Sequence, residues 1–157
     1  MLENPWLIIT FLGTPEIWLG IAGVLTAFYL LHHWKRREEK RLRRYLKVFL
    51  IAFAIVFVIV GVVKEGTAIP RPCNGLPDCE VGSSFPSGHA AIMFSVTVST
   101  LLFLKRKWLP ILIVPVLVSW SRIALGVHTM MDIVGGAILG TAVPLFVYWA
   151  VLKRQKE

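Results

Sequence analysis

The chain alternates between long apolar stretches and short polar segments. Five apolar runs are each close to the about 17 to 25 residues with which a helix crosses a bilayer. They fall at roughly 15–33, 45–63, 89–104, 108–125 and 132–152. A further apolar stretch, Pro5 to Leu12, is too short to cross at about 1.5 Å per residue. The pattern therefore predicts five membrane-spanning helices, preceded by a short helix that lies in the membrane interface.

The composition agrees with this pattern. Hydrophobic residues make up 56% of the 157 residues and charged residues only 17%, which is too apolar for an ordinary soluble domain. Because no repeat, linker or low-complexity tract interrupts the chain, we expect one all-α domain over residues 1–157, an integral membrane helical bundle. Gly136 and Gly140 in the last run predict close helix packing within this bundle, with dimerisation as the alternative.

Basic residues are distributed unevenly between the polar segments. Of the 17 Lys and Arg residues, thirteen lie in segments that five spans place on one side: seven in 35–44, three in 105–107 and three in 153–156. The positive-inside rule assigns that side, with Lys47, to the cytoplasm. The net charge of +8 then reflects topology and contact with anionic lipid, and no other feature supports nucleic-acid binding. Only three basic residues remain.

Those three cations belong to three short motifs. The motifs are Lys64 with Arg71-Pro72, Pro86-Ser87-Gly88-His89, and Ser121-Arg122 with His128 and Asp132. They supply two histidines, two arginines, a lysine and an aspartate, a set that can hold and transfer a phosphoryl group. On a continuous helix Arg122 and His128 would point about 240° apart. We therefore expect the helix to end at Gly126, so that both can reach one site.

The spacing of the motifs resembles the type 2 phosphatidic acid phosphatase family, whose pattern is K-x6-RP, then PSGH, then SR-x5-H-x3-D. Every fixed position is matched between residues 64 and 132. The resemblance implies an integral membrane lipid phosphatase, although family members usually have six spans, one more than is predicted here. Small bacterial members include phosphatidylglycerophosphate phosphatases, undecaprenyl pyrophosphate phosphatases and lipid A 1-phosphatases. The shared motifs read only the phosphate and do not select among these lipids.

The same resemblance implies a role for each histidine. His128 would be the nucleophile that forms a phosphohistidine, and Asp132, one helical turn further on, would orient it and stabilise its positive charge. His89 would protonate the leaving group and then activate water.

The resemblance also implies a phosphate clamp. Lys64, Arg71 and Arg122 would hold the non-bridging oxygens, because guanidinium forks match phosphate geometry. Ser87 and the backbone of Gly88 would assist them at a helix N-terminus, where free N–H groups favour anions.

The longest loop, 65–85, is expected on the outer side and holds the only two cysteines, Cys73 and Cys79. Two thiols with no nearby histidine are too few ligands for a metal site. A disulfide suits an oxidising outer compartment, and free thiols are the alternative. We also expect no metal or other cofactor at the motifs, because their only carboxylate, Asp132, is committed to a histidine.

The expected substrate is a lipid phosphate or pyrophosphate, cleaved at the outer face of the inner (plasma) membrane. The alternative is a transporter that binds a phospholipid head group without cleaving it, although such a protein has no need of a histidine–aspartate pair. Vanadium haloperoxidases resemble the family in the same motifs, but they are soluble, and the five spans argue against them. The outer loops offer few polar groups that could select a head group, namely Asn74, Asp78, Glu80 and Thr129. We therefore expect activity on several lipids.

Overall fold

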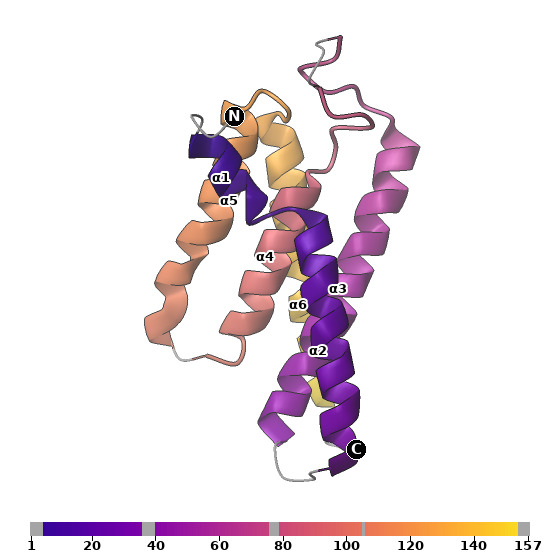
Figure 1. The fold of residues 1–157 in the computed structure, drawn as a ribbon, viewed down its shortest axis with the longest axis vertical. Coiled ribbons are helices and arrows are strands. Elements are labelled where there is room, and N and C mark those ends of the chain that lie inside the picture. Colours follow the sequence, from indigo (N-terminus) through magenta and orange to yellow (C-terminus); the bar gives the residue numbers. More distant parts are fainter. Residues whose placement is uncertain (1–4, 36–39, 76–78, 105, 154–157) are drawn as a thin grey trace.

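The computed structural model describes residues 5–35, 40–75, 79–104 and 106–153, and within these ranges it contains helices and no strand (Figure 1). The elements are α1 (Pro5–Phe11), α2 (Pro15–Lys35), α3 (Lys40–Thr67), α4 (Gly88–Leu101), the 3-10 helix η1 (Arg106–Leu112), α5 (Ile113–Ala124) and α6 (Met130–Lys153). The predicted all-α class is thereby confirmed. Asp78 and five of the basic residues used for the orientation, Arg36, Arg37, Lys105, Arg154 and Lys156, lie outside the described residues.

Four of the five predicted spans correspond to one helix each, whereas the run at 108–125 corresponds to η1 followed directly by α5. By length and composition, four segments could cross a membrane: Pro5–Phe28, Lys40–Thr67, Arg106–Ala124 and Met130–Val151. The fifth apolar helix, Gly88–Leu101, is shorter, with 14 residues. The chain is therefore a multi-pass membrane protein built from a helical bundle.

The first apolar segment is divided in two by a turn. Gly13 N–H donates to the Thr10 carbonyl at 2.9 Å, and Pro15, which suits a first helical position, begins α2. The indole of Trp18 donates to the Leu12 carbonyl at 2.6 Å and holds the turn. As a result α1 packs against α5, whereas α2 packs against α3 (Figure 1). The short helix predicted for the interface is thus also part of the bundle, and it buries Thr10.

Helices α3, α4 and α6 form the centre of the bundle, and eight of the 14 residues of α4 are buried. Its contact with α6 depends on glycine. A Cβ added to Gly136 would lie 2.5 Å from the Ser87 carbonyl oxygen, and one added to Gly140 would lie even closer to the Ala91 carbonyl oxygen. The glycine pattern therefore serves helix packing within one chain, which was the first of the two predictions.

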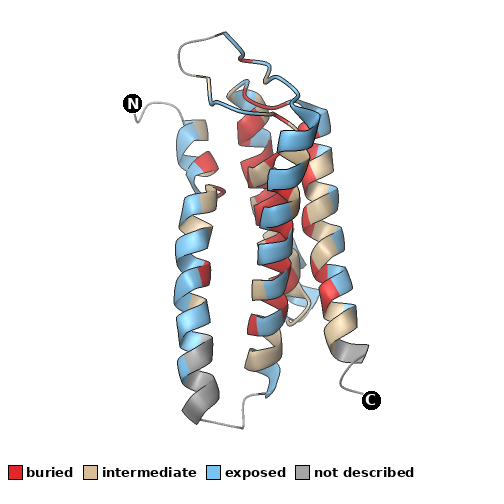
Figure 2. Cartoon of the chain, turned by 90° about the vertical axis from the view of Figure 1, so that its right-hand side faces the viewer, coloured by how far each residue is buried: buried red, intermediate tan, exposed pale blue. Residues whose placement is uncertain are grey.

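The outward faces of the bundle are apolar. Helix α2 exposes Val24 and Leu31 by 70% and 73%, and α6 exposes Phe146 by 65%. In Figure 2 most of α2, at the left, is coloured as exposed, while the buried residues gather on the helices to its right. Exposed apolar area on this scale is unusual for a monomeric soluble protein, and it is what a lipid-facing surface requires.

Candidate active site

Each of the three motifs lies at a helix end or in a loop between two helices. These helix ends and loops all lie at the same end of the bundle (Figure 1). Lys64 lies in the last turn of α3, and His89 lies in the first turn of α4. Arg122 lies in the last turn of α5, and Asp132 in the first turn of α6. Helix α5 ends at Ala124 and Gly126 adopts a φ of 69°, so the chain turns where it was expected to turn.

His128 and Asp132 form a buried pair. Nδ1 of His128 lies 3.4 Å from Oδ2 of Asp132, and the two side chains are only 1% and 3% exposed. The same Oδ2 accepts the Thr129 backbone N–H at 2.7 Å, and Oδ1 accepts the Ser84 hydroxyl at 3.4 Å. The carboxylate is therefore fixed from two sides and can orient the imidazole.

The second ring nitrogen of His128 faces a cation. Nη1 of Arg71 lies 3.3 Å from Nε2. Since a guanidinium can only donate, Nε2 accepts, and the ring proton belongs on Nδ1, toward Asp132. Burial, followed by the charges of Arg71, Arg122 and Lys64, lowers the pKa of His128 to about 4. The ring is consequently neutral at neutral pH and keeps a lone pair on Nε2, which is the form that a nucleophile needs.

His89 is buried at the start of α4, 9% exposed. Its Nε2 has no hydrogen-bond partner among the described residues. Buried polar atoms are normally satisfied, so this nitrogen is suited to meet a ligand atom. The turn between α1 and α2 covers the ring, since a Cβ on Gly13 would lie 3.0 Å from Cδ2 of His89 and 2.5 Å from Val118.

The two arginines converge on one carboxylate, that of Glu80. Nη1 of Arg71 lies 2.9 Å from Oε2 of Glu80, and Nη2 of Arg122 donates to Oε1. Nη1 of Arg122 also donates to the Thr10 hydroxyl at 2.9 Å, which ties α1 to the site. The third cation is engaged differently, because Nζ of Lys64 donates to the Ser83 carbonyl at 2.6 Å.

Ser87 and Gly88 lie where α4 begins. The Ser87 hydroxyl accepts the Ala90 N–H at 3.5 Å as the helix cap, and the Ser87 N–H donates to the Asp132 carbonyl at 2.9 Å. Ser87 thus joins the start of α4 to the start of α6, and it holds the two histidine motifs together. A Cβ on Gly88 would meet only Val60, at 3.7 Å.

The loop beside the site is cross-linked. The structure joins Cys73 to Cys79 in a disulfide with a Cα–Cα distance of 5.5 Å. A cavity of about 220 Å³ lies next to it, and both Arg71 and Glu80 line this cavity. In the part of the chain that the structure describes, no group of three or more His, Cys, Asp or Glu residues could hold a metal ion.

Sequence reasoning missed two contributors to the site. Thr10 gave no signal, because its bond to Arg122 joins residues 112 positions apart. Glu80 was considered only as a polar group for recognising a head group, whereas the structure places it on both arginines. An acidic residue next to a cysteine in a motif-bearing loop was the only available hint.

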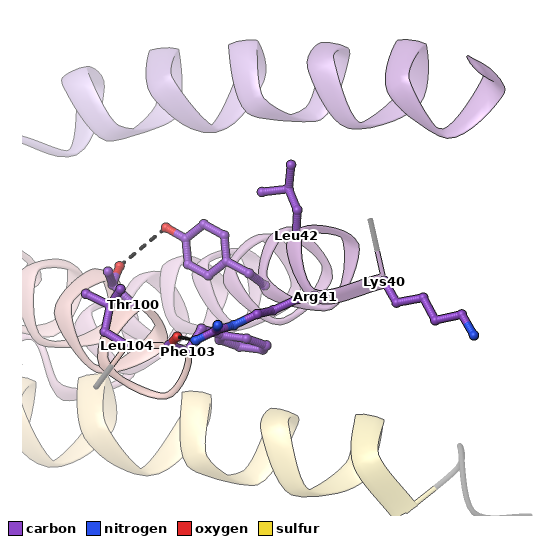
Figure 3. Close-up of a pocket in the computed structure, with 7 residues that line it drawn as sticks. Lys40, Arg41, Leu42, Thr100, Phe103 and Leu104 are labelled. Carbon is purple, nitrogen blue, oxygen red and sulfur yellow. Dashed lines mark hydrogen bonds between the residues drawn. The ribbon is translucent and has the colours of Figure 1, made fainter. Parts of the chain in front are cut away.

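A separate cavity lies at the other end of the bundle. It measures about 700 Å³ and is lined by Lys40, Arg41, Leu42, Tyr45, Thr100, Phe103 and Leu104 (Figure 3). The dashed lines of that view include the 3.3 Å contact between Tyr45 and Thr100. Lys64 follows Arg41 by 23 residues of the same helix, which is about 35 Å. This cavity is therefore separate from the motifs.

Comparison with known proteins agrees with the motifs. Residues 45–156 match the model of the PAP2 superfamily. Over 80 residues the chain is 39% identical to the Bacillus licheniformis "Bacitracin transport permease protein BcrC", and over 60 residues it is 48% identical to a Sulfolobus acidocaldarius "Undecaprenyl-diphosphatase". These matches cover 51% and 37% of this chain, but only 39% and 29% of the relatives' own lengths.

The fold has a close counterpart among solved structures. The crystal structure of a transmembrane PAP2-type phosphatidylglycerolphosphate phosphatase from Bacillus subtilis superposes with a TM-score of 0.71 at 26% identity. The superposition covers 97% of this chain and 80% of that one. The family match covers most of the chain and includes all three motifs, so the protein belongs to the PAP2 superfamily.

Proposed function

We propose that the protein is a membrane lipid phosphatase that cleaves lipid phosphate or pyrophosphate monoesters through a phosphohistidine. The observation that carries the proposal is the orientation of His128. Its Nδ1 lies against Asp132 and its Nε2 against Arg71, among buried cations at one end of a membrane bundle. Membership of the family and the names of two relatives, an undecaprenyl-diphosphatase and a phosphatidylglycerolphosphate phosphatase, support the phosphatase activity.

The first half-reaction transfers the phosphoryl group to the protein. The lone pair on Nε2 of His128 attacks the terminal phosphorus, and the bond from that phosphorus to the lipid oxygen breaks, or to the bridging oxygen when the substrate is a pyrophosphate. Arg71 and Arg122 stabilise the charge on the non-bridging oxygens. His89 gives a proton to the departing lipid oxygen. Asp132 stabilises the positive charge that the His128 ring acquires.

The second half-reaction releases the phosphate. His89, now neutral, takes a proton from water, and the water oxygen attacks phosphorus. The bond between phosphorus and Nε2 of His128 breaks and inorganic phosphate is released. The other product is the lipid alcohol from a lipid phosphate, or the lipid monophosphate from a lipid pyrophosphate. Each histidine returns to its starting protonation state after one turnover.

The proposal is tested by phosphate release from a panel of lipids. Purified wild-type protein and His128→Ala should be compared on phosphatidylglycerophosphate, undecaprenyl pyrophosphate and lipid A 1-phosphate, with and without excess EDTA. We expect release by the wild type on more than one lipid, with EDTA present, and none by the variant. Activity lost in EDTA and restored by Mg²⁺ would contradict the metal-free mechanism. No release from any lipid would contradict the phosphatase assignment.

A transporter is the second candidate, because one relative is named a transport permease. The same panel separates the two functions. A transporter would bind the lipid head group and leave the phosphate content unchanged, whereas a phosphatase turns over. We favour the phosphatase because binding alone gives no role to a histidine held by an aspartate.

The proposed site faces the outside of the inner (plasma) membrane. This orientation rests on the excess of basic residues at the opposite end. A cysteine at Val81, a residue that is 98% exposed, should react with an impermeant thiol reagent added to intact cells. A cysteine at the exposed residue Arg106 should react only after lysis. The reverse result would place the site in the cytoplasm.

A further inference from the structure

Glu80 lies over the two buried arginines of the site. Its carboxylate oxygens contact one arginine each, Oε2 with Arg71 at 2.9 Å and Oε1 with Arg122. Glu80 is 44% exposed, while the arginine side chains are 8% and 3% exposed. The carboxylate therefore covers the cations from the solvent side. It offers them two oxygens in the geometry that two phosphate oxygens would use.

The position of Glu80 coincides with the place that a reacting phosphoryl group needs. One nitrogen, Nη1 of Arg71, contacts both Oε2 of Glu80 and Nε2 of His128. A phosphorus atom attacked by Nε2 would bring its non-bridging oxygens to that same nitrogen. Glu80 and the substrate phosphate consequently compete for one cation beside the nucleophile.

The Glu80 side chain is ionised, and it can turn away from the two arginines. Burial alone would raise the pKa of Glu80, but the hydrogen bond from Arg122 and the charges of both arginines hold it below the usual carboxyl value. On one side Glu80 is joined to Cys79 of the disulfide. On the other side come the exposed residues Val81 and Gly82. Gly82 has a φ of 98°, which residues with a side chain rarely adopt. Only Glu80 would have to turn toward solvent to uncover the arginines.

We propose that the Glu80 carboxylate competes with phosphate for the Arg71–Arg122 pair and thereby keeps released phosphate from occupying the site. The proposal rests on the proposed function, since it concerns the same phosphate site. Any ligand must displace the carboxylate, which weakens binding of every phosphate by the same factor. A lipid substrate is concentrated in the bilayer next to the site, so it overcomes this competition. Free inorganic phosphate has no such advantage, and the product is released instead of blocking the enzyme.

The test measures phosphate binding directly. Inorganic phosphate should be titrated by calorimetry into the detergent-solubilised wild type, Glu80→Gln and the matched control Glu65→Gln. Glu65 is an exposed carboxylate at the same end of the bundle. We expect Glu80→Gln to bind phosphate about tenfold more tightly, which corresponds to about 1.4 kcal/mol. The control should equal the wild type. Phosphate should inhibit lipid hydrolysis by Glu80→Gln more strongly by the same factor.

The outcomes separate two kinds of failure. Unchanged or weaker phosphate binding in Glu80→Gln would overturn the proposal and make Glu80 a mere support for the arginines. If that variant does not fold, Glu80→Asp gives the same test, because its shorter carboxylate cannot reach both arginines and should also bind phosphate more tightly. A wild type that binds phosphate but releases none from any lipid would refute the proposed function and leave the binding result standing.

Discussion

The two ends of the bundle both carry cations, but they handle them in opposite ways. At the end with the motifs, the Arg71 and Arg122 side chains are nearly inaccessible and share Glu80 as a partner. At the opposite end, Lys40 and Arg41 are exposed on the rim of an open cavity. A charge removed from water needs partners to compensate, whereas an exposed one does not. The few buried cations, not the many exposed ones, therefore identify the site.

The sharpest test of this comparison removes the nucleophile. His128→Ala should lower kcat by about 10³-fold or more, and Asp132→Asn should slow turnover to a similar extent by releasing the imidazole. Lys107→Ala, at the basic end, should change kcat by less than about twofold. The measurement is phosphate release from a lipid by proteins of matched thermal stability. Full activity of His128→Ala would end the proposed mechanism.

A second test exchanges one cation for another at each end. Arg122→Lys keeps the charge but loses the fork that reaches both Thr10 and Glu80, so kcat/KM should fall by about 100-fold. Arg106→Lys, on the exposed side, is the matched control and should be indistinguishable from wild type. If both substitutions lowered kcat/KM equally, the buried arginine would be no more important for activity than the exposed one.

A third test concerns α1. Thr10→Val removes the hydroxyl that accepts from Arg122 while keeping the shape of the side chain, and kcat/KM should fall by about fivefold, the worth of one hydrogen bond. Thr10→Ser retains the hydroxyl and should restore most of the activity. A loss that Ser does not rescue would point to packing of α1 against α5 instead.

The smallest expected effect is a change in the pKa of His128. With burial and three cations disfavouring the imidazolium, the pKa of His128 lies near 4, so the ring should be neutral at pH 6, with the proton on Nδ1. Arg71→Gln should raise this pKa toward the ordinary value of about 6.5. Nitrogen-15 spectra of histidine-labelled protein, assigned with His128→Gln, report both properties. A protonated ring at pH 6 in the wild type would contradict the arrangement.

The sequence predicted the helices well, because apolar runs of the right length leave little choice in a bilayer. The apolar run at 45–63 is shorter than the helix that contains it, α3 (Lys40–Thr67). The helix continues into charged residues at its ends, and these are not part of an apolar run. The division of the first segment was also foreseen, with α2 beginning at Pro15. What the sequence could not predict was where α1 packs, because that depends on shape complementarity between distant helices.

The same distinction holds for the site. The spacing from His128 to Asp132 is local, so one helical turn predicted their contact. The approach of Arg71 to His128 depends on how the loop before α4 folds across the bundle, and no local pattern encodes it. The contacts of Thr10 and Glu80 are of this second kind, and neither belongs to a motif.

The glycine contact between α4 and α6 has a consequence for enzymes that work in membranes of different thickness. Helices that meet through long side chains can slide or tilt against each other when the bilayer thins, whereas at Gly136 and Gly140 the backbone of α6 itself lies against α4. No flexible side chain of α6 can rearrange there. Hydrophobic mismatch would tilt the pair as one body. His89 begins one of these helices, and Asp132 lies in the first turn of the other. The distance between them should therefore stay the same from one lipid mixture to the next.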